Sequence, residues 1–177
     1  MESSQLQCMI ECDPVLYGSI IGVYPADRLP LKLPSTPFGF IANTDPHNAH
    51  GQHWCAFYCD TPGYVDFFDS YGREPSRNSE HFQSWLNKKA KTIRINRIQL
   101  QSETSSVCGL YCVLFLRERL LGHSYQDFIN KFDSMALNSN DEYIASTMLN
   151  AYPICFAKYE NNNQTCSSLV CIPDLNT

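Results

Sequence analysis

Apolar and polar residues follow each other in patterns that predict strands and helices along most of this chain. Two aromatic-rich runs, residues 53–60 and 64–72, are joined by Thr-Pro-Gly, which predicts a β-hairpin. Residues 79–91 carry apolar side chains at helical spacing, and residues 92–101 begin with the apolar–polar alternation of a strand. Residues 38–45 are a further strand candidate. Strands therefore dominate the first part of the chain.

Helices dominate the second part. Residues 106–122 predict a helix of about four turns, which Gly122 ends as C-cap. Its first half is apolar on all sides, which predicts burial in the middle of the domain. Shorter helices are expected at residues 3–12, 124–132 and 139–152. The order of elements predicts one α+β domain over residues 1–160, followed by a polar, flexible tail at 161–177.

The composition fits a single globular domain and excludes several classes of protein. The chain has 177 residues, of which 44% are hydrophobic and 18% charged. Its net charge of −5 argues against a surface devoted to nucleic acid, and no apolar run approaches the roughly 20 residues of a membrane span. The first residues show no secretory signal. We therefore expect an intracellular protein, nuclear or cytoplasmic and not secreted, whose nine cysteines are thiols.

Cys108 is a candidate nucleophile because of its place at the start of the buried helix. Residues 104–106 supply cap candidates, which puts Cys108 in the first turn, where the helix dipole and unpaired N–H groups favour the thiolate. Gly109 leaves room for a substrate carbonyl, and the backbone N–H groups there can bind an oxyanion. Two alternatives stay open: Cys108 and Cys112 are plain core residues, or their i, i+4 spacing binds a metal.

A cysteine nucleophile needs a base, and His53 is the best placed of the five histidines. It opens a predicted strand, follows Gly51 closely and precedes Trp54, which can cover one side of the imidazole ring. A metal cluster of His47, His50 and His53 is an alternative, but this spacing in a loop is a weak signal. We expect no metal.

The hairpin register selects the group that orients His53. With the turn at residues 61–63, His53 lies opposite a residue near position 70, so we expect Asp69 to pair with it. Asp66 lies too close to the turn. The alternative role for Asp69 is to cap the turn that follows the strand.

An oxyanion is often held by a side-chain donor as well as by backbone N–H groups. Gln101 ends a predicted strand, in the loop that leads to Cys108, and is the candidate for this role. Gln99 is a substitute that sits earlier in the strand.

These residues, in this order and spacing, resemble the catalytic segments of adenain, the maturation protease of adenoviruses, and more distantly the SUMO-specific proteases of the same clan. The matching segments are GQHWCAFY, VDFFDSYG and LQSETSSVCGLYC. The N-terminal helix and residues 22–30 also resemble adenain and the related proteins of Polinton (Maverick) mobile elements. The resemblance spans roughly residues 1–150.

The resemblance implies a mixed β-sheet flanked by helices, with Cys108 at the N-terminus of the central helix. It implies a cysteine endopeptidase that cleaves viral or mobile-element capsid precursors next to small residues such as Gly, packaged in virions where the source is a virus. The implied site residues are His53, Asp69, Gln101 and Cys108 for catalysis, and Gly51, Trp54 and Gly109 for substrate binding. The alternatives are an isopeptidase that removes SUMO-type modifiers and a non-enzymatic protein-binding domain.

No cofactor is expected for the chemistry itself, and we expect a monomer that acts on a protein or peptide and touches no membrane. Adenain is activated by DNA and by a peptide joined through a disulfide, but residues 86–98 contain no cysteine, which leaves strand addition as the way for a peptide to bind. Five basic side chains in one short segment are a candidate nucleic-acid contact, with a solvated helix face and strand edge as the alternative. They are Lys88, Lys89, Lys91, Arg94 and Arg97.

Overall fold

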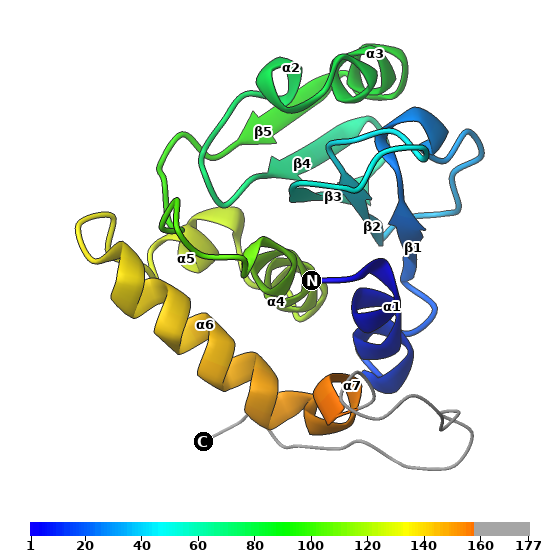
Figure 1. Ribbon diagram of the computed structural model, residues 1–177. Coiled ribbons are helices and arrows are strands. Elements are labelled where there is room, and N and C mark those ends of the chain that lie inside the picture. The colour runs from blue at the N-terminus through cyan, green and yellow to red at the C-terminus, as the bar shows by residue number, and fades with distance from the viewer. Residues whose placement is uncertain (158–177) are drawn as a thin grey trace.

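The computed structural model describes residues 1–157, and within them five strands form one mixed sheet with helices on both faces (Figure 1). The strands are β1 (Ile20–Tyr24), β2 (Phe38–Asn43), β3 (Trp54–Thr61), β4 (Tyr64–Phe68) and β5 (Thr92–Ile95). The helices are α1 (Ser3–Cys12), the 3₁₀ turn η1 (Ala26–Arg28), α2 (Pro75–Asn78), α3 (Glu80–Lys89), α4 (Cys108–Leu120), α5 (Tyr125–Ile129), α6 (Leu137–Ala151) and α7 (Pro153–Ala157). The predicted α+β fold is confirmed, and the predicted tail at 161–177 lies outside the described residues.

The strands follow each other in space in their sequence order, β1-β2-β3-β4-β5. The inner pairs β2/β3 and β3/β4 are antiparallel, and the outer pairs β1/β2 and β4/β5 are parallel. In the predicted hairpin, Ala56 pairs with Phe68 and Phe57 with Phe67. This register carries His53, just before β3, towards the residues that follow β4. None of the helices within residues 1–157 is long and apolar enough to cross a bilayer.

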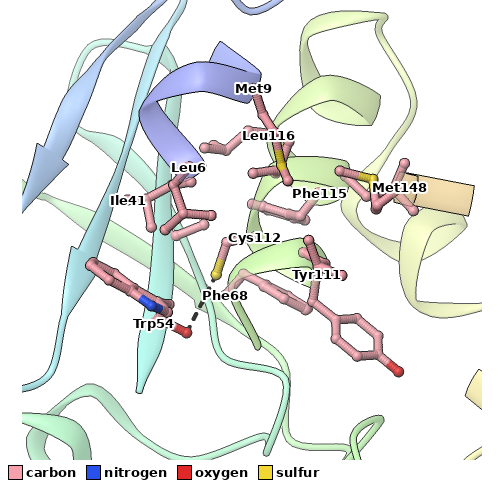
Figure 2. Close-up of a cluster of buried hydrophobic side chains, with 14 of the residues drawn as sticks. Leu6, Met9, Ile41, Trp54, Phe68, Tyr111, Cys112, Phe115, Leu116 and Met148 are labelled. Carbon is pink, nitrogen blue, oxygen red and sulfur yellow. Dashed lines mark hydrogen bonds between the residues drawn. The ribbon is translucent and has the colours of Figure 1, made fainter. Parts of the chain in front are cut away.

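Side chains of β3 alternate between two hydrophobic clusters, because successive residues of a strand point to opposite faces of the sheet. Phe57 and its odd-numbered neighbours pack against α3, through Phe82 and Trp85. Trp54 and the even-numbered residues pack against α1, α4, α5 and α6. Figure 2 shows this second cluster, with Cys112 at its centre, where the thiol donates to the carbonyl of Trp54 over 3.3 Å. Cys112 is therefore a packing residue, the first of the two alternatives left open for it.

Helix α4 is the buried centre of the domain, as predicted. Its C-terminus forms a Schellman motif: Gly122 has φ of +90° and donates to the carbonyl of Arg119, while His123 donates to that of Glu118. The predicted side-chain cap at residues 104–106 is wrong. Val107 precedes the helix and no side chain caps it. The physical reason is that residues 102–105 hydrogen-bond one another and Gln101 instead.

One prediction about the cysteines is wrong. The structure joins Cys8 of α1 and Cys155 of α7 in a disulfide, with their Cα atoms 5.7 Å apart, although 147 residues separate them in sequence. The long helix α6 brings the chain back so that the short helix α7, which the pattern did not predict, lies beside α1 (Figure 1). The expectation of nine thiols could not anticipate this contact.

Candidate active site

His53 lies immediately before β3 and is buried, with 6% of its surface exposed. Its Nε2 lies 2.6 Å from Oδ1 of Asp69, as the hairpin register predicts. The ring that packs on His53 is Tyr71, with ring centroids 4.7 Å apart. The sequence interpretation gave that covering position to Trp54 and no role to Tyr71, which it placed near the end of the second hairpin run. The register that placed Asp69 would also have indicated Tyr71.

Asp69 is fully buried, and each of its carboxylate oxygens accepts two hydrogen bonds. Oδ1 accepts from His53 and from the backbone N–H of Tyr71 (3.0 Å), and Oδ2 from the N–H of Arg73 (3.1 Å) and from Nδ2 of Asn78 (3.0 Å). Burial alone would raise the pKa of Asp69, but these hydrogen bonds, led by that to His53, outweigh it and lower the pKa. Asp69 thus fills both roles considered for it, turn cap and partner of His53.

Two asparagines that sequence reasoning missed fix Asp69 in place. Asn78, from the unpredicted helix α2, holds the carboxylate, as described above. Asn96, just after β5, brackets the Asp69 backbone: its Oδ1 accepts the Asp69 N–H over 3.1 Å, and its Nδ2 donates to the Asp69 carbonyl over 2.6 Å. Tyr125 donates to the same Asn96 oxygen over 3.2 Å. No local sequence signal marks such contacts, since they join segments that fold together only in three dimensions.

Cys108 is the first residue of α4, is 6% exposed and interacts with His53. Because Nε2 of His53 faces Asp69, Nδ1 is the ring nitrogen that remains available to the thiol. Burial alone would raise the pKa of Cys108, yet the hydrogen bond and charge of His53 lower it. For His53, burial would lower the pKa, but the hydrogen bonds to Asp69 and Cys108 raise it to about 9. Both shifts favour a thiolate–imidazolium pair at neutral pH.

Gln101 is fully buried in the loop before α4. Its Oε1 accepts from the hydroxyl of Ser70 over 2.6 Å, and its Nε2 donates to the carbonyl and the hydroxyl of Ser105, each over 3.0 Å. The side chain is therefore fixed, with its amide N–H groups directed at Ser105. Gln99, the substitute, donates to the Gln101 carbonyl over 2.9 Å.

The three candidate substrate-binding residues lie around the beginning of the chain. Gly51 has φ of +76°, and a Cβ there would come within 2.8 Å of Asn43. With Trp54 it lines a pocket of about 340 Å³ that residues 1–3 also line. A Cβ on Gly109 would come within 2.8 Å of the Met1 sulfur, and Trp54 Nε1 donates to the Met1 carbonyl over 3.2 Å. Gly109 thus admits Met1 to the helix start, a packing role besides the one predicted.

The expectation of no metal set aside two candidate donor sets, the pair of Cys108 and Cys112 and the loop histidines, and the structure adds a further set. His47, a member of the loop-histidine alternative, has its Nδ1 2.6 Å from Asp27, and no donor group close enough to share a metal within residues 1–157 contains it. His53, Cys55 and Asp69 do lie within reach of one ion. However, His53 and Asp69 are bound to each other, and complete burial raises the pKa of Cys55, which keeps it a neutral thiol. The arrangement suits proton transfer better than metal binding.

The basic segment does not form one free cationic surface. Arg94 makes two hydrogen bonds with the buried carboxylate of Asp66, of 2.8 and 2.9 Å, and Arg97 pairs with Glu74. Lys89 donates to the carbonyl of Leu31 over 2.7 Å. Nucleic-acid binding through this segment stays a prediction, with two of its five charges compensated by carboxylates.

The site has the arrangement found in cysteine hydrolases: a thiol at a helix start, an imidazole beside it, and a buried carboxylate that holds the imidazole. Comparison with known proteins agrees, although no protein-family model matches the chain. The chain is 32% identical over 110 residues to the SUMO-1 cysteine protease of African swine fever virus, a match that covers 56% of this chain and 40% of the viral protein. It is 27% identical over 149 residues to the protease of bovine adenovirus 7, covering 60% of this chain and 74% of that protein.

One solved structure shares the fold of this chain. The central domain of an uncharacterised protein from Legionella pneumophila superposes with a TM-score of 0.53 at 14% identity, covering 89% of this chain and 98% of that chain. The crystal structure of the African swine fever virus protease gives a TM-score of 0.45 at 27% identity, covering 57% of this chain and 40% of that chain. The sequence matches confirm the predicted resemblance to adenain-like cysteine proteases, and they span two-fifths of the African swine fever virus protein.

Proposed function

We propose that this chain is a cysteine endopeptidase of the adenain type. The observation that carries the proposal is the line of three buried side chains in which Cys108 contacts His53 and His53 contacts Asp69. The raised pKa of His53 and the lowered pKa of Cys108 supply the nucleophile without a separate base. The relatives from African swine fever virus and bovine adenovirus 7 are both named as proteases, which supports the same activity.

The proposed reaction is acyl transfer to sulfur followed by hydrolysis. The Cys108 thiolate attacks the scissile carbonyl carbon, and the carbonyl electron pair moves onto oxygen. As the tetrahedral intermediate collapses, Nδ1–H of His53 protonates the leaving amine and a thioester remains. His53 then takes a proton from water, and the resulting hydroxide attacks the thioester carbon. The C–S bond breaks and releases the acid, which leaves the Cys108 thiolate beside the protonated His53. Asp69 holds the imidazole so that Nδ1 faces sulfur throughout.

The oxyanion would be held by the backbone N–H of Cys108 and by the side-chain amide of Gln101. Both amide hydrogens of Gln101 are directed at Ser105. Substrate binding would therefore exchange one of the Ser105 contacts for the oxyanion. Such tightening of a donor on substrate binding is common in hydrolases whose apo geometry is looser.

The proposed substrates are proteins cleaved beside small residues such as Gly, with viral or mobile-element capsid precursors as the natural class. Gly51, Trp54 and Gly109 would contact the substrate. Support comes from the crowding at the helix start: a Cβ on Gly109 would come within 2.8 Å of the Met1 sulfur and 3.3 Å of Trp54, which leaves little room beside Cys108 for a large substrate side chain.

Removal of a SUMO-type modifier is the competing activity. The observation that favours it is that the relative from African swine fever virus is named as a SUMO-1 cysteine protease. Both activities use the same three residues, so the substrate and not the chemistry separates them.

An activating peptide or DNA would act away from the triad. Strand β5 lies at the edge of the described sheet and offers its outer side to an added strand. We propose that the chain is a monomer. We also propose that it works in reducing surroundings, inside a cell or a virion, because the Cys108 thiolate would otherwise be oxidised.

Cleavage of a peptide library, and of modifier-ended substrates, by purified protein with and without DNA tests the proposal. We expect Cys108→Ala to abolish cleavage and Cys112→Ala, one turn deeper in the same helix, to retain it, because Cys112 contributes packing only. Full cleavage by Cys108→Ala would refute the nucleophile. Preference for modifier-ended substrates over Gly-containing peptides would replace the endopeptidase by the isopeptidase.

A further inference from the structure

A cluster of three sulfur atoms lies at the corner where α1 meets α7, and the proposed peptidase chemistry does not use it. Cys8 and Cys12 stand four residues apart on α1, so both side chains lie on one face of the helix. Cys155 reaches them from α7. The three sulfurs lie within 4.8 Å of one another. A disulfide joins two of the three, Cys8 and Cys155.

The corner is fixed by contacts that do not depend on the disulfide. The buried carboxylate of Asp13, directly after Cys12, accepts from Nε of Arg117 in α4 over 2.9 Å and from the hydroxyl of Tyr152. Tyr152 lies just before α7, which carries Cys155. The end of α1 is thereby tied to the beginning of α7. Reduction of the disulfide would leave three thiols held close together.

Reduction is also what the proposed function requires. A Cys108 thiolate persists only where thiols are kept reduced, and there an accessible disulfide is reduced as well. Cys8, one of the two bonded cysteines, is only partly buried, although Cys155 is fully buried. The active form of the proposed enzyme would therefore carry Cys8, Cys12 and Cys155 as thiols. This step rests on the proposed function, whereas the sulfur geometry does not.

We propose that the reduced cluster of Cys8, Cys12 and Cys155 is a zinc site that clasps α1 to α7. A dithiol or phosphine reductant supplies two electrons and two protons to the disulfide, which becomes two thiols. Zn²⁺ binding then displaces one proton from each of the three thiols and forms three Zn–S bonds. Zn–S bonds of about 2.3 Å in tetrahedral geometry place sulfurs about 3.8 Å apart, a spacing the cluster reaches with small side-chain rotations.

Soft thiolate ligands select zinc over magnesium or calcium. Asp13 does not supply the fourth ligand, because Arg117 and Tyr152 occupy the Oδ2 atom and the Val15 N–H the Oδ1 atom. Water would complete the coordination as the fourth ligand, because Cys12 is partly exposed. Because zinc would bind the folded chain and join its first helix to its last described one, it would raise thermal stability.

The test uses the full chain carrying Cys108→Ala, which removes thiolate binding of zinc at the candidate active site. The protein is reduced with a phosphine, freed of metal with a chelator and titrated with Zn²⁺ or Co²⁺. We expect one ion per chain by native mass spectrometry, thiolate-to-cobalt charge-transfer absorption and a higher Tm with zinc. Cys8→Ser and Cys155→Ser should lose all three signals. Cys59→Ser, on the opposite face of the sheet, should keep them.

The cysteine-to-serine variants of the cluster can fail to fold. A second measurement therefore alkylates the Cys108→Ala chain, in which Cys8, Cys12 and Cys155 are intact. Zinc should protect the partly exposed Cys8 and Cys12 from alkylation and leave Cys59 unaffected. Zinc binding that persists in Cys8→Ser and Cys155→Ser, an absence of binding to the reduced chain, or an absence of protection would each overturn the proposal. Peptidase activity is measured separately, so failure of the zinc site and failure of the proposed function give different results.

Discussion

Replacement of Asp69 by asparagine perturbs the most constrained side chain of the candidate site. The carboxylate accepts from four donors: His53 and the Tyr71 N–H at Oδ1, and the Arg73 N–H and Asn78 at Oδ2. An amide has a single acceptor oxygen. Whichever way the new side chain turns, its NH₂ group faces two donors.

The cost of the two orientations differs, and the difference selects one. With the NH₂ group at the Oδ2 position, two part-buried donors, the Arg73 N–H and the Asn78 amide, lose this acceptor, at up to about 1–3 kcal/mol each. With the NH₂ group at the Oδ1 position, His53 can lose its Nε2 proton and accept a hydrogen bond from the new amide. Only the Tyr71 N–H then lacks an acceptor, at about 1–3 kcal/mol in total. We therefore expect the second orientation. It fixes the proton on Nδ1, which faces Cys108, and the imidazole can no longer take the thiol proton.

The expected result is a folded protein with its free energy of unfolding lowered by about 1–3 kcal/mol and its kcat lowered about 10⁴-fold, the size of the corresponding change in a serine protease triad. Urea denaturation gives the free energy of unfolding. Steady-state cleavage of the best substrate from the peptide-library experiment gives kcat. Glu74→Gln, which changes an exposed acid nearby, is the matched control and should alter neither by much. An Asp69→Asn variant that folds and retains kcat within about tenfold of the unchanged chain contradicts the proton-transfer role given to the pair.

The other predictions concern the ion pair and a buried salt bridge. His53→Ala removes the hydrogen bond and charge that lower the pKa of Cys108, so alkylation of Cys108 at about pH 6 should slow at least tenfold, and an unchanged rate would show that the thiolate does not depend on His53. Because the pKa of His53 is raised above its unfolded value, its contribution to stability is complete below about pH 6.5 and is lost as the pH rises through about 9, which pH-dependent urea denaturation of the unchanged chain and of His53→Ala should show. Asp66→Asn leaves the buried Arg119 without its full partner and should lower the free energy of unfolding by about 3 kcal/mol, whereas the exposed Arg97→Gln should lower it by less than about 1 kcal/mol; equal effects would contradict this use of burial.

The pairing of His53 with Asp69 could be predicted because it depends on one short hairpin. The turn at residues 61–63 and the two-residue period of a strand fix which positions face each other. The observed pairing of Ala56 with Phe68 confirms that register. The same arithmetic separated Asp69 from Asp66, which instead binds Arg94 and Arg119. Local chain geometry was enough for this part of the site.

Contacts between distant segments could not be predicted in this way. Asn78 and Asn96 reach Asp69 only after α2 and β5 have folded against the hairpin. The contact between Cys8 and Cys155 depends on how α6 crosses the domain and on where α7 begins. A single sequence carries no periodic signal for such contacts, because each depends on the packing of whole elements.

Gln101 shows where the two kinds of information meet. Its distance from Cys108 in sequence indicated the right loop, and its complete burial agrees with a role inside the site. The direction of its amide, however, is set by Ser70 from the end of the hairpin and by Ser105 from the same loop. Ser70 donates to Oε1 and so fixes which way the amide faces. Nε2 is the donor that the Gln101 side chain can offer to an oxyanion. The proposed oxyanion role therefore depends on whether a bound substrate displaces Ser105 from Nε2. The Ser105→Ala variant removes the hydroxyl acceptor but keeps the carbonyl acceptor. It should leave kcat unchanged or raise it. A fall in kcat for a folded Ser105→Ala variant would instead mean that the hydroxyl positions the amide for catalysis.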